Sequence, residues 1–156
     1  MMSLTSKVLP SMKNRQIGHI VAVSAICGII GFPFNSIYSA SKFAVEGYCE
    51  SLREELKDFC INLTLVEPGP VFTHFDQKSV DKMADKDIDS TTKKLFETFM
   101  QKNNDSYQTM GQTPEEVAVQ IRQLIEHGKS EQLCHYTNPI YTNALSQVYR
   151  EEVFSS

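Results

Sequence analysis

The feature that most constrains this chain is a pair of short segments that suit buried β-strands. Residues 18–24 (GHIVAVS) form a nearly continuous apolar run, and residues 61–67 (INLTLVE) form a second strand-like run, which Pro68-Gly69-Pro70 ends. A continuous apolar run is typical of a parallel strand that is covered on both faces. Helical patterns follow both runs, and strands that alternate with crossover helices predict an α/β fold with a parallel sheet.

The remaining elements continue this alternation, and we expect one domain over residues 1–156. Thr113 and Glu116 form a capping box, and Pro114 occupies the first helical position, so a helix is expected to begin there. The other expected elements are a helix through the first fifteen residues, a loop at 27–35, helices at 36–59 and 91–102, a short strand at 133–137 and a final helix at 139–153.

The expected helix at 36–59 has two distinct faces. One is an apolar stripe suited to the core, and the other is a stripe of small residues: Val45, Leu52, Leu56 and Phe59 on the first, and Ala40, Ala44, Gly47 and Ser51 on the second. Small side chains let another helix approach closely. The second stripe therefore fits either packing within the chain or the interface of a homo-oligomer.

Composition argues against several classes of function. The formal net charge is -4, and the longest cluster of basic residues is the pair Lys93-Lys94, so we expect no binding to nucleic acid. None of the four cysteines forms a Cys-x-x-Cys pair, and no three histidines have metal-ligand spacing, so no metal site is expected. The first residues lack an apolar signal core, which favours a cytoplasmic protein.

One stretch has the length of a membrane span. No charged residue occurs between Ile20 and Ser41. However, Pro33 would break a spanning helix, and the second half of the stretch is polar. We therefore expect a buried strand, a loop and the start of a helix there, and no membrane span.

The clearest chemical signal is the segment Tyr38-Ser39-Ala40-Ser41-Lys42. Residues four apart on a helix share a face, which places the Tyr38 phenol one turn from the Lys42 ammonium. A free tyrosine has a pKa of about 10, and a neighbouring positive charge favours the phenolate. The pair can therefore act as a general acid and base at a carbonyl or alcohol oxygen.

Three segments together resemble the short-chain dehydrogenase/reductase family: residues 18–24, residues 33–47 (PFNSIYSASKFAVEG) and residues 65–73 (LVEPGPVFT). The resemblance covers nearly the whole chain and corresponds to the C-terminal half of the family's domain. It is greatest to the branch that acts on steroids and retinoids. It implies a Rossmann-like parallel sheet of which the N-terminal nucleotide-binding half is absent.

The resemblance also implies roles for individual residues. Tyr38 would donate and accept the proton, and Lys42 would lower its pKa and hold the nicotinamide ribose. The loop from Pro68 and Gly69 to Thr73 would lie along the nicotinamide, with Val71 and Thr73 at its carboxamide. The implied activity is the interconversion of a lipophilic alcohol and its carbonyl compound with NAD or NADP. The apolar face formed by Leu95, Phe96, Phe99 and Met100 fits either a cover over such a substrate or a plain docking helix.

The chain departs from the family's pattern at two places. None of its seven glycines belongs to a Gly-x-Gly-x-x-Gly turn. The family's substrate-orienting serine lies thirteen residues before the tyrosine, where this chain has Ala25, and Ser24 precedes it by one residue. Neighbouring strand residues point to opposite faces, so Ser24 would reach the substrate only if the strand end is distorted. These departures leave open a non-catalytic relative that binds a partner or a lipid.

Overall fold

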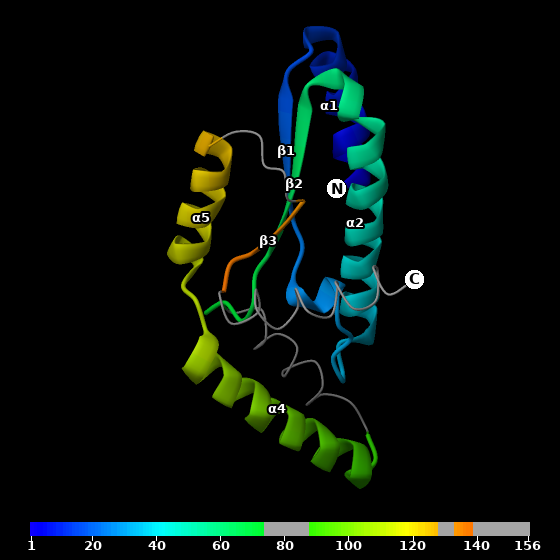
Figure 1. The fold of residues 1–156 in the computed structure, drawn as a ribbon. Helices are drawn as coiled ribbons and strands as arrows, with labels where there is room; N and C mark the ends of the chain where they lie inside the picture. Colours follow the sequence, from blue (N-terminus) through cyan, green and yellow to red (C-terminus); the bar gives the residue numbers. More distant parts are fainter. Residues whose placement is uncertain (74–87, 128–132, 139–156) are drawn as a thin grey trace, which may run out of the picture.

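The computed structural model describes residues 1–73, 88–127 and 133–138. Its centre is a parallel sheet in the order β1-β2-β3, formed by Gly18–Val23, Ile61–Glu67 and Cys134–Tyr136 (Figure 1). Gly18 pairs with Ile61 and Val23 with Val66, so β1 and β2 run in register along their whole length. The predicted α/β fold with a parallel, Rossmann-like sheet is confirmed.

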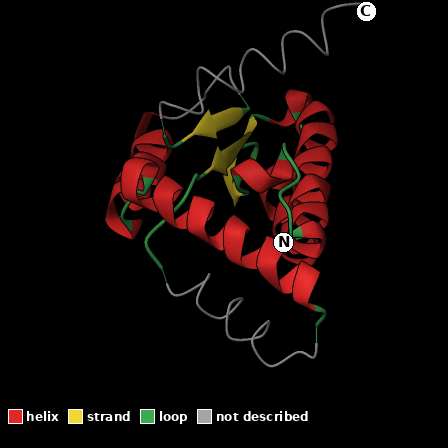
Figure 2. Ribbon diagram, turned by 90° about the horizontal axis from the view of Figure 1, so that it is seen from below, coloured by secondary structure: helices red, strands yellow, loops and turns green. Residues whose placement is uncertain are grey.

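Helices cover both faces of this sheet. α1 and α2 lie on one side and α5 on the other, and α4 crosses beyond the carboxyl ends of the strands (Figures 1 and 2). The bounds are Met2–Arg15 for α1, Ser36–Glu55 for α2, Ser90–Met110 for α4 and Pro114–His127 for α5, with short 3-10 turns η1 at Ile26–Gly28 and η2 at Lys57–Phe59.

Two helices differ in length from the prediction. α2 ends at Glu55 rather than at residue 59, because the turn η2 and a left-handed Cys60 (φ 51°) redirect the chain into β2. α4 is much longer than 91–102, because it continues to Met110. Its start is close to the expected one, and there the carboxylate of the N-cap Asp89 accepts from the Thr91 and Thr92 amides at 3.0 and 2.9 Å. The helix expected at 139–153 lies outside the described residues.

The capping box of α5 is confirmed. The Thr113 amide donates to Glu116 Oε2 at 2.7 Å, and the Glu116 amide donates to Thr113 Oγ1 at 3.2 Å. In the described ranges, no helix is both long enough and apolar enough to cross a membrane. The uncharged stretch from Ile20 to Ser41 divides into β1, η1, a loop and the first turns of α2.

The core lies between the sheet and the inner face of α2. Its buried members come from both elements: Ala22, Cys49, Leu52, Leu56, Ile61, Leu63 and Leu65. The predicted apolar stripe therefore faces the core, with Val45 and Phe59 packed at its edge. The small-residue stripe faces outward, because Ala40, Ala44, Gly47 and Ser51 are all exposed.

Gly28 joins the end of β1 to the start of α2. A Cβ at this position would lie 2.8 Å from Ser24 Oγ and 2.9 Å from Glu46 Oε1. A side chain at position 28 would therefore push against the Ser24 and Glu46 side chains, because the strand end and the helix meet there. Gly31 differs, since nothing lies within 4 Å of a Cβ built on it.

Gly28→Ala is therefore expected to lower the free energy of unfolding by about 1–3 kcal/mol through overpacking. Gly31→Ala is the matched control, and we expect it to leave stability within about 0.5 kcal/mol of the parent. Urea unfolding of both variants checks the difference, and equal effects would contradict the packing described here.

Candidate active site

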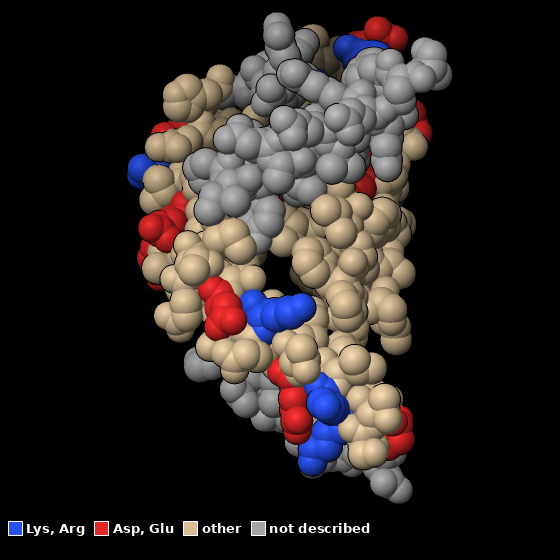
Figure 3. All heavy atoms as spheres, turned by 60° about the horizontal axis from the view of Figure 1, so that its bottom comes forward, with Lys and Arg blue, Asp and Glu red and all other residues tan. Residues whose placement is uncertain are grey.

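A cavity opens where the carboxyl ends of β1 and β2 meet. Its volume is about 300 Å³, and Figure 3 shows the molecule hollowed on this face, above α4. Ligands of open α/β sheets bind at such strand ends. The cavity is lined by residues 23–27 at the end of β1, Phe32 and Asn35 from the loop before α2, Tyr38 and Lys42 from α2, residues 68–71 and Thr73 after β2, and Phe99, Asn103 and Tyr107 from α4.

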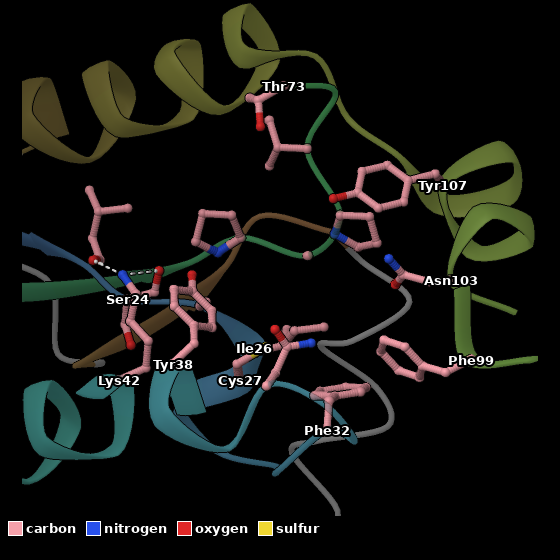
Figure 4. A pocket seen from close by; sticks show the side chains of 17 residues that line it. Ser24, Ile26, Cys27, Phe32, Tyr38, Lys42, Thr73, Phe99, Asn103 and Tyr107 are labelled. Atoms are coloured by element: carbon pink, nitrogen blue, oxygen red, sulfur yellow. Dashed lines mark hydrogen bonds between the residues drawn. The ribbon is translucent and has the colours of Figure 1, made fainter. Parts of the chain in front are cut away.

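The structure brings Tyr38 and Lys42 together on one wall of this cavity. The Lys42 Nζ atom lies 5.6 Å from the centroid of the Tyr38 ring. Lys42 also donates to the backbone carbonyls of Val23 at 3.0 Å and Ser24 at 3.2 Å (Figure 4). Burial lowers the pKa of Lys42, whereas the neighbouring Cys27 and Glu46 raise it.

The Ser24 side chain is not positioned to present its hydroxyl to a substrate. The residue is 3% exposed, and its Oγ atom is closed off from solvent beside Gly28 and the Glu46 carboxylate. Its backbone carbonyl is the part that meets Lys42. Ala25 is also buried, with an extended backbone (φ -169°, ψ 164°). A substrate contact through the Ser24 hydroxyl stays a prediction, and this burial does not favour it.

The loop after β2 is held from both sides. On one side the Ile26 amide donates to the Pro68 carbonyl at 3.2 Å. On the other, the Gln112 amide donates to the Pro70 carbonyl at 2.9 Å, and the Phe72 amide donates to the Gln112 carbonyl at 2.9 Å. All four loop residues predicted for the cofactor line the cavity, namely Pro68, Gly69, Val71 and Thr73.

The far wall of the cavity comes from α4. Phe99, Asn103 and Tyr107 are spaced by four residues and therefore share one face of this helix. Sequence reasoning missed the last two because the helix was expected to end at residue 102. The four-residue spacing from Phe99 was the signal that could have found them. Of the face predicted from Leu95 to Met100, Phe99 lines the cavity, and Leu95 is 59% exposed.

The Phe34 ring, in the loop before α2, packs against α4. Its ring centroid lies 5.3 Å from that of Phe96 in an edge-on arrangement and 5.8 Å from that of Phe99. Its backbone has a φ of 60°, which is uncommon for a bulky residue and is held here by these ring contacts. The apolar side of α4 is thus anchored over the cavity.

Glu67, the last residue of β2, is a buried acid next to the loop that lines the cavity. Its side chain is fully buried (0% exposed) and lies beside Glu46 of α2 and Cys134 of β3. Burial, together with the nearby Glu46 charge, raises the pKa of Glu67 to about 8.

Comparison with known sequences agrees with the motifs. The family described as short chain dehydrogenase matches residues 1–84. The chain is 40% identical over 143 residues to "Retinol dehydrogenase 8" of Bos taurus, covering 89% of this chain and 46% of that protein. It is 40% identical over 113 residues to "17-beta-hydroxysteroid dehydrogenase type 1" of Homo sapiens, covering 70% and 34%. The chain thus spans about half or less of these relatives.

Solved structures share the architecture. A short-chain dehydrogenase/reductase from Burkholderia phymatum in complex with NAD superposes with a TM-score of 0.70 at 20% identity, over 97% of this chain and 54% of that one. A serine dehydrogenase complexed with NADP+ superposes with a TM-score of 0.62 at 25% identity, over 87% and 50%. The first likeness concerns the fold alone.

Proposed function

Because this chain belongs to the short chain dehydrogenase family, we propose that it carries the proton-transfer and nicotinamide-binding half of an NAD(P)-dependent oxidoreductase. The proposed reaction interconverts a lipophilic alcohol and its carbonyl compound. One observation carries the proposal: Tyr38 and Lys42 face the same cavity as the loop that runs from Pro68 to Thr73.

The chemistry of the chain follows from this arrangement. A bound nicotinamide would supply or accept the hydride. The Tyr38 hydroxyl would donate a proton to the carbonyl oxygen of the substrate, or take one from the alcohol. The Lys42 ammonium favours the phenolate form of Tyr38, because a nearby positive charge stabilises the anion. General acid–base catalysis of this type contributes about 10²–10⁴-fold to a rate.

The residues of the cavity fit a nicotinamide. Lys42 has three N–H donors, and two of them are used by the carbonyls of Val23 and Ser24. Among the described residues no acceptor is found for the third, which we assign to a ribose hydroxyl. Gly69 offers no side chain, which lets the backbone approach a flat ring. Val71 and Thr73 would then hold the carboxamide.

The far wall supports a lipophilic substrate. Phe99 of this wall presents an apolar ring to the cavity, as does Phe32 from the loop before α2 (Figure 4). The amides of Asn103 and Asn35 and the phenol of Tyr107 add a few polar groups. Predominantly apolar pockets with a few polar groups suit small lipophilic ligands. The similar proteins are named for retinol and for 17-beta-hydroxysteroids. We propose a retinoid or a steroid alcohol, and NAD and NADP remain equal candidates.

The family binds the cofactor pyrophosphate at a Gly-x-Gly-x-x-Gly turn, and no glycines of this sequence form such a turn. The glycines at 28 and 31 follow a strand but lead into α2, the helix of Tyr38. We therefore propose that the part of the cofactor beyond the nicotinamide ribose is bound by residues other than these 156.

A second candidate function rests on a different observation. Ala25 stands where the family has a serine hydroxyl, and the Ser24 hydroxyl is buried. Loss of one such donor costs on the order of 10²–10³ in rate. A non-catalytic relative that binds a lipid or a partner in the same cavity would tolerate this loss.

We also propose that α2 packs against a second copy of the chain. Gly47 lies at the centre of the exposed small-residue stripe, with nothing within 4 Å of a Cβ built there. Ile37, near the start of the same helix, is 87% exposed. Close helix packing needs a face of this kind.

Binding of NADH tests the enzymatic proposal without requiring turnover. In saturation-transfer difference NMR, we expect the nicotinamide ring protons to receive the strongest signal and the adenine protons a weak one. Lys42→Met should weaken the nicotinamide signal, whereas Lys94→Met, on the exposed side of α4, should not. An adenine-dominated signal, or no signal from a chain shown to be folded, would contradict the proposal and favour the non-catalytic alternative.

The α2 interface has its own test. Gly47→Arg is expected to convert a dimer to a monomer in sedimentation analysis, because the large side chain blocks close helix approach. Ser3→Arg on α1 provides the control and should leave the mass unchanged. A parent chain that sediments as a monomer, or a dimer that survives Gly47→Arg, would exclude this interface.

A further inference from the structure

Behind the cavity lies a buried pair of acids that the proposed reaction does not use. Glu46 of α2 is 4% exposed, and Glu67 at the end of β2 is 0% exposed. One carboxylate oxygen of each and the Sγ atom of Cys134 all lie within 4.8 Å of one another. Tyr38, Lys42 and Glu46 are spaced by four residues, so their side chains follow one another along one face of α2.

The two carboxyl groups lack the partners that buried charges require. Within the described residues, none of their four oxygens has a donor in hydrogen-bond geometry, although the Ser24 hydroxyl lies near Glu46 and the Cys134 thiol near Glu67, and each lowers the pKa of the acid beside it. An ionised carboxylate only accepts hydrogen bonds, so two ionised groups would face each other unsatisfied and repel. A single proton removes both problems, because it turns one oxygen into a donor for the other carboxylate.

We propose that Glu46 and Glu67 share one proton, and that the single negative charge left on this pair is the counter-charge that keeps Lys42 protonated beside Tyr38. The second half of this inference rests on the proposed function, whereas the first half does not. Glu46 and Glu67 are thus positioning residues, which act on the reaction through Lys42.

The charges and pKa shifts of the groups around the two acids are consistent with one net negative charge on the pair. Burial raises the pKa of both acids, and the charge of Glu50, one turn further along α2, raises both as well. On the sheet side, burial and the Glu67 charge raise the pKa of Cys134, which keeps this thiol neutral. Burial also raises the pKa of Cys49 to about 11. Lys42 is the cation whose charge acts on Glu46.

A divalent metal is the competing occupant of this cluster. Two carboxylates and a thiolate form a ligand set that zinc accepts. That occupant would require Cys134 to lose its proton next to two anions, and the proton-sharing pair requires no such step. The two occupants therefore predict different results for the same measurements.

Infrared spectroscopy detects the shared proton directly. At neutral pH we expect the carbonyl stretch of a protonated carboxyl group, shifted in heavy water. Glu46→Gln or Glu67→Gln should each remove it, because the amide replaces the protonated partner and the remaining acid ionises. Glu97→Gln, on the exposed side of α4, is the control and should leave it in place. Absence of the band in the parent, or its survival in both single variants, would overturn the shared proton.

The charge on the pair is tested through Lys42. Either single glutamine variant keeps one negative charge, so the pKa of Lys42, followed by its 13Cε shift, should stay close to that of the parent. The double variant Glu46→Gln/Glu67→Gln removes the charge, and the pKa of Lys42 should fall. An unchanged Lys42 titration in the double variant would refute the counter-charge. Neither measurement needs a cofactor or substrate, so a failed NADH experiment is distinguishable from a failure here.

The pH dependence of stability gives a third readout. The pKa of Glu67 rises from 4.5 to about 8 on folding, so the folded chain keeps a proton that the unfolded chain has released. The contribution of Glu67 to the free energy of unfolding should therefore be greatest below pH 4.5, and it should be lost as the pH rises towards 8. Glu67→Gln should flatten this decline in urea unfolding. If the purified chain instead contains one equivalent of zinc, and Glu67→Gln contains none, a metal and not a proton occupies the cluster.

Discussion

The site depends on where the Lys42 ammonium is held. Two carbonyls at the end of β1, those of Val23 and Ser24, accept hydrogen bonds from it, which ties helix α2 to the carboxyl end of the sheet. The same contact fixes Tyr38 one turn away, facing the cavity. A cation in this half-buried position needs both acceptors and a compensating charge. The carbonyls supply the first, and the acid pair at Glu46 and Glu67 is proposed to supply the second.

The parallel sheet explains why the remaining groups gather at the same place. Because β1 and β2 run in register, their ends lie side by side, and the loops that leave them enclose one cavity. Hydrogen bonds from η1 and from Gln112 hold the second loop, and the rings of Phe34, Phe96 and Phe99 hold α4 across the opening. The site is therefore built from backbone hydrogen bonds and ring contacts of the fold, with few side chains carrying the chemistry.

Local signals predicted much of this arrangement. The apolar run at 18–24, the capping box at Thr113 and the Tyr38–Lys42 spacing each depend on residues close in sequence, and the structure contains the corresponding strand, helix start and facing pair. What was not predicted depends on distant residues. The burial of Glu67 needs Glu46 from another element, and the burial of Ser24 follows from the turn at Gly28. The polar composition of α4 hid its true length, since none of its residues is buried.

The most direct test of the account is the titration of the Tyr38 phenol, followed by the 13Cζ resonance of labelled tyrosine in the parent and in Lys42→Met. If the lysine charge serves the tyrosine, the pKa of Tyr38 should be higher in Lys42→Met than in the parent, because the phenolate has lost its stabilising cation. Lys94→Met should not change it. An identical Tyr38 titration in the parent and in Lys42→Met would mean that the two residues do not form an acid–base unit.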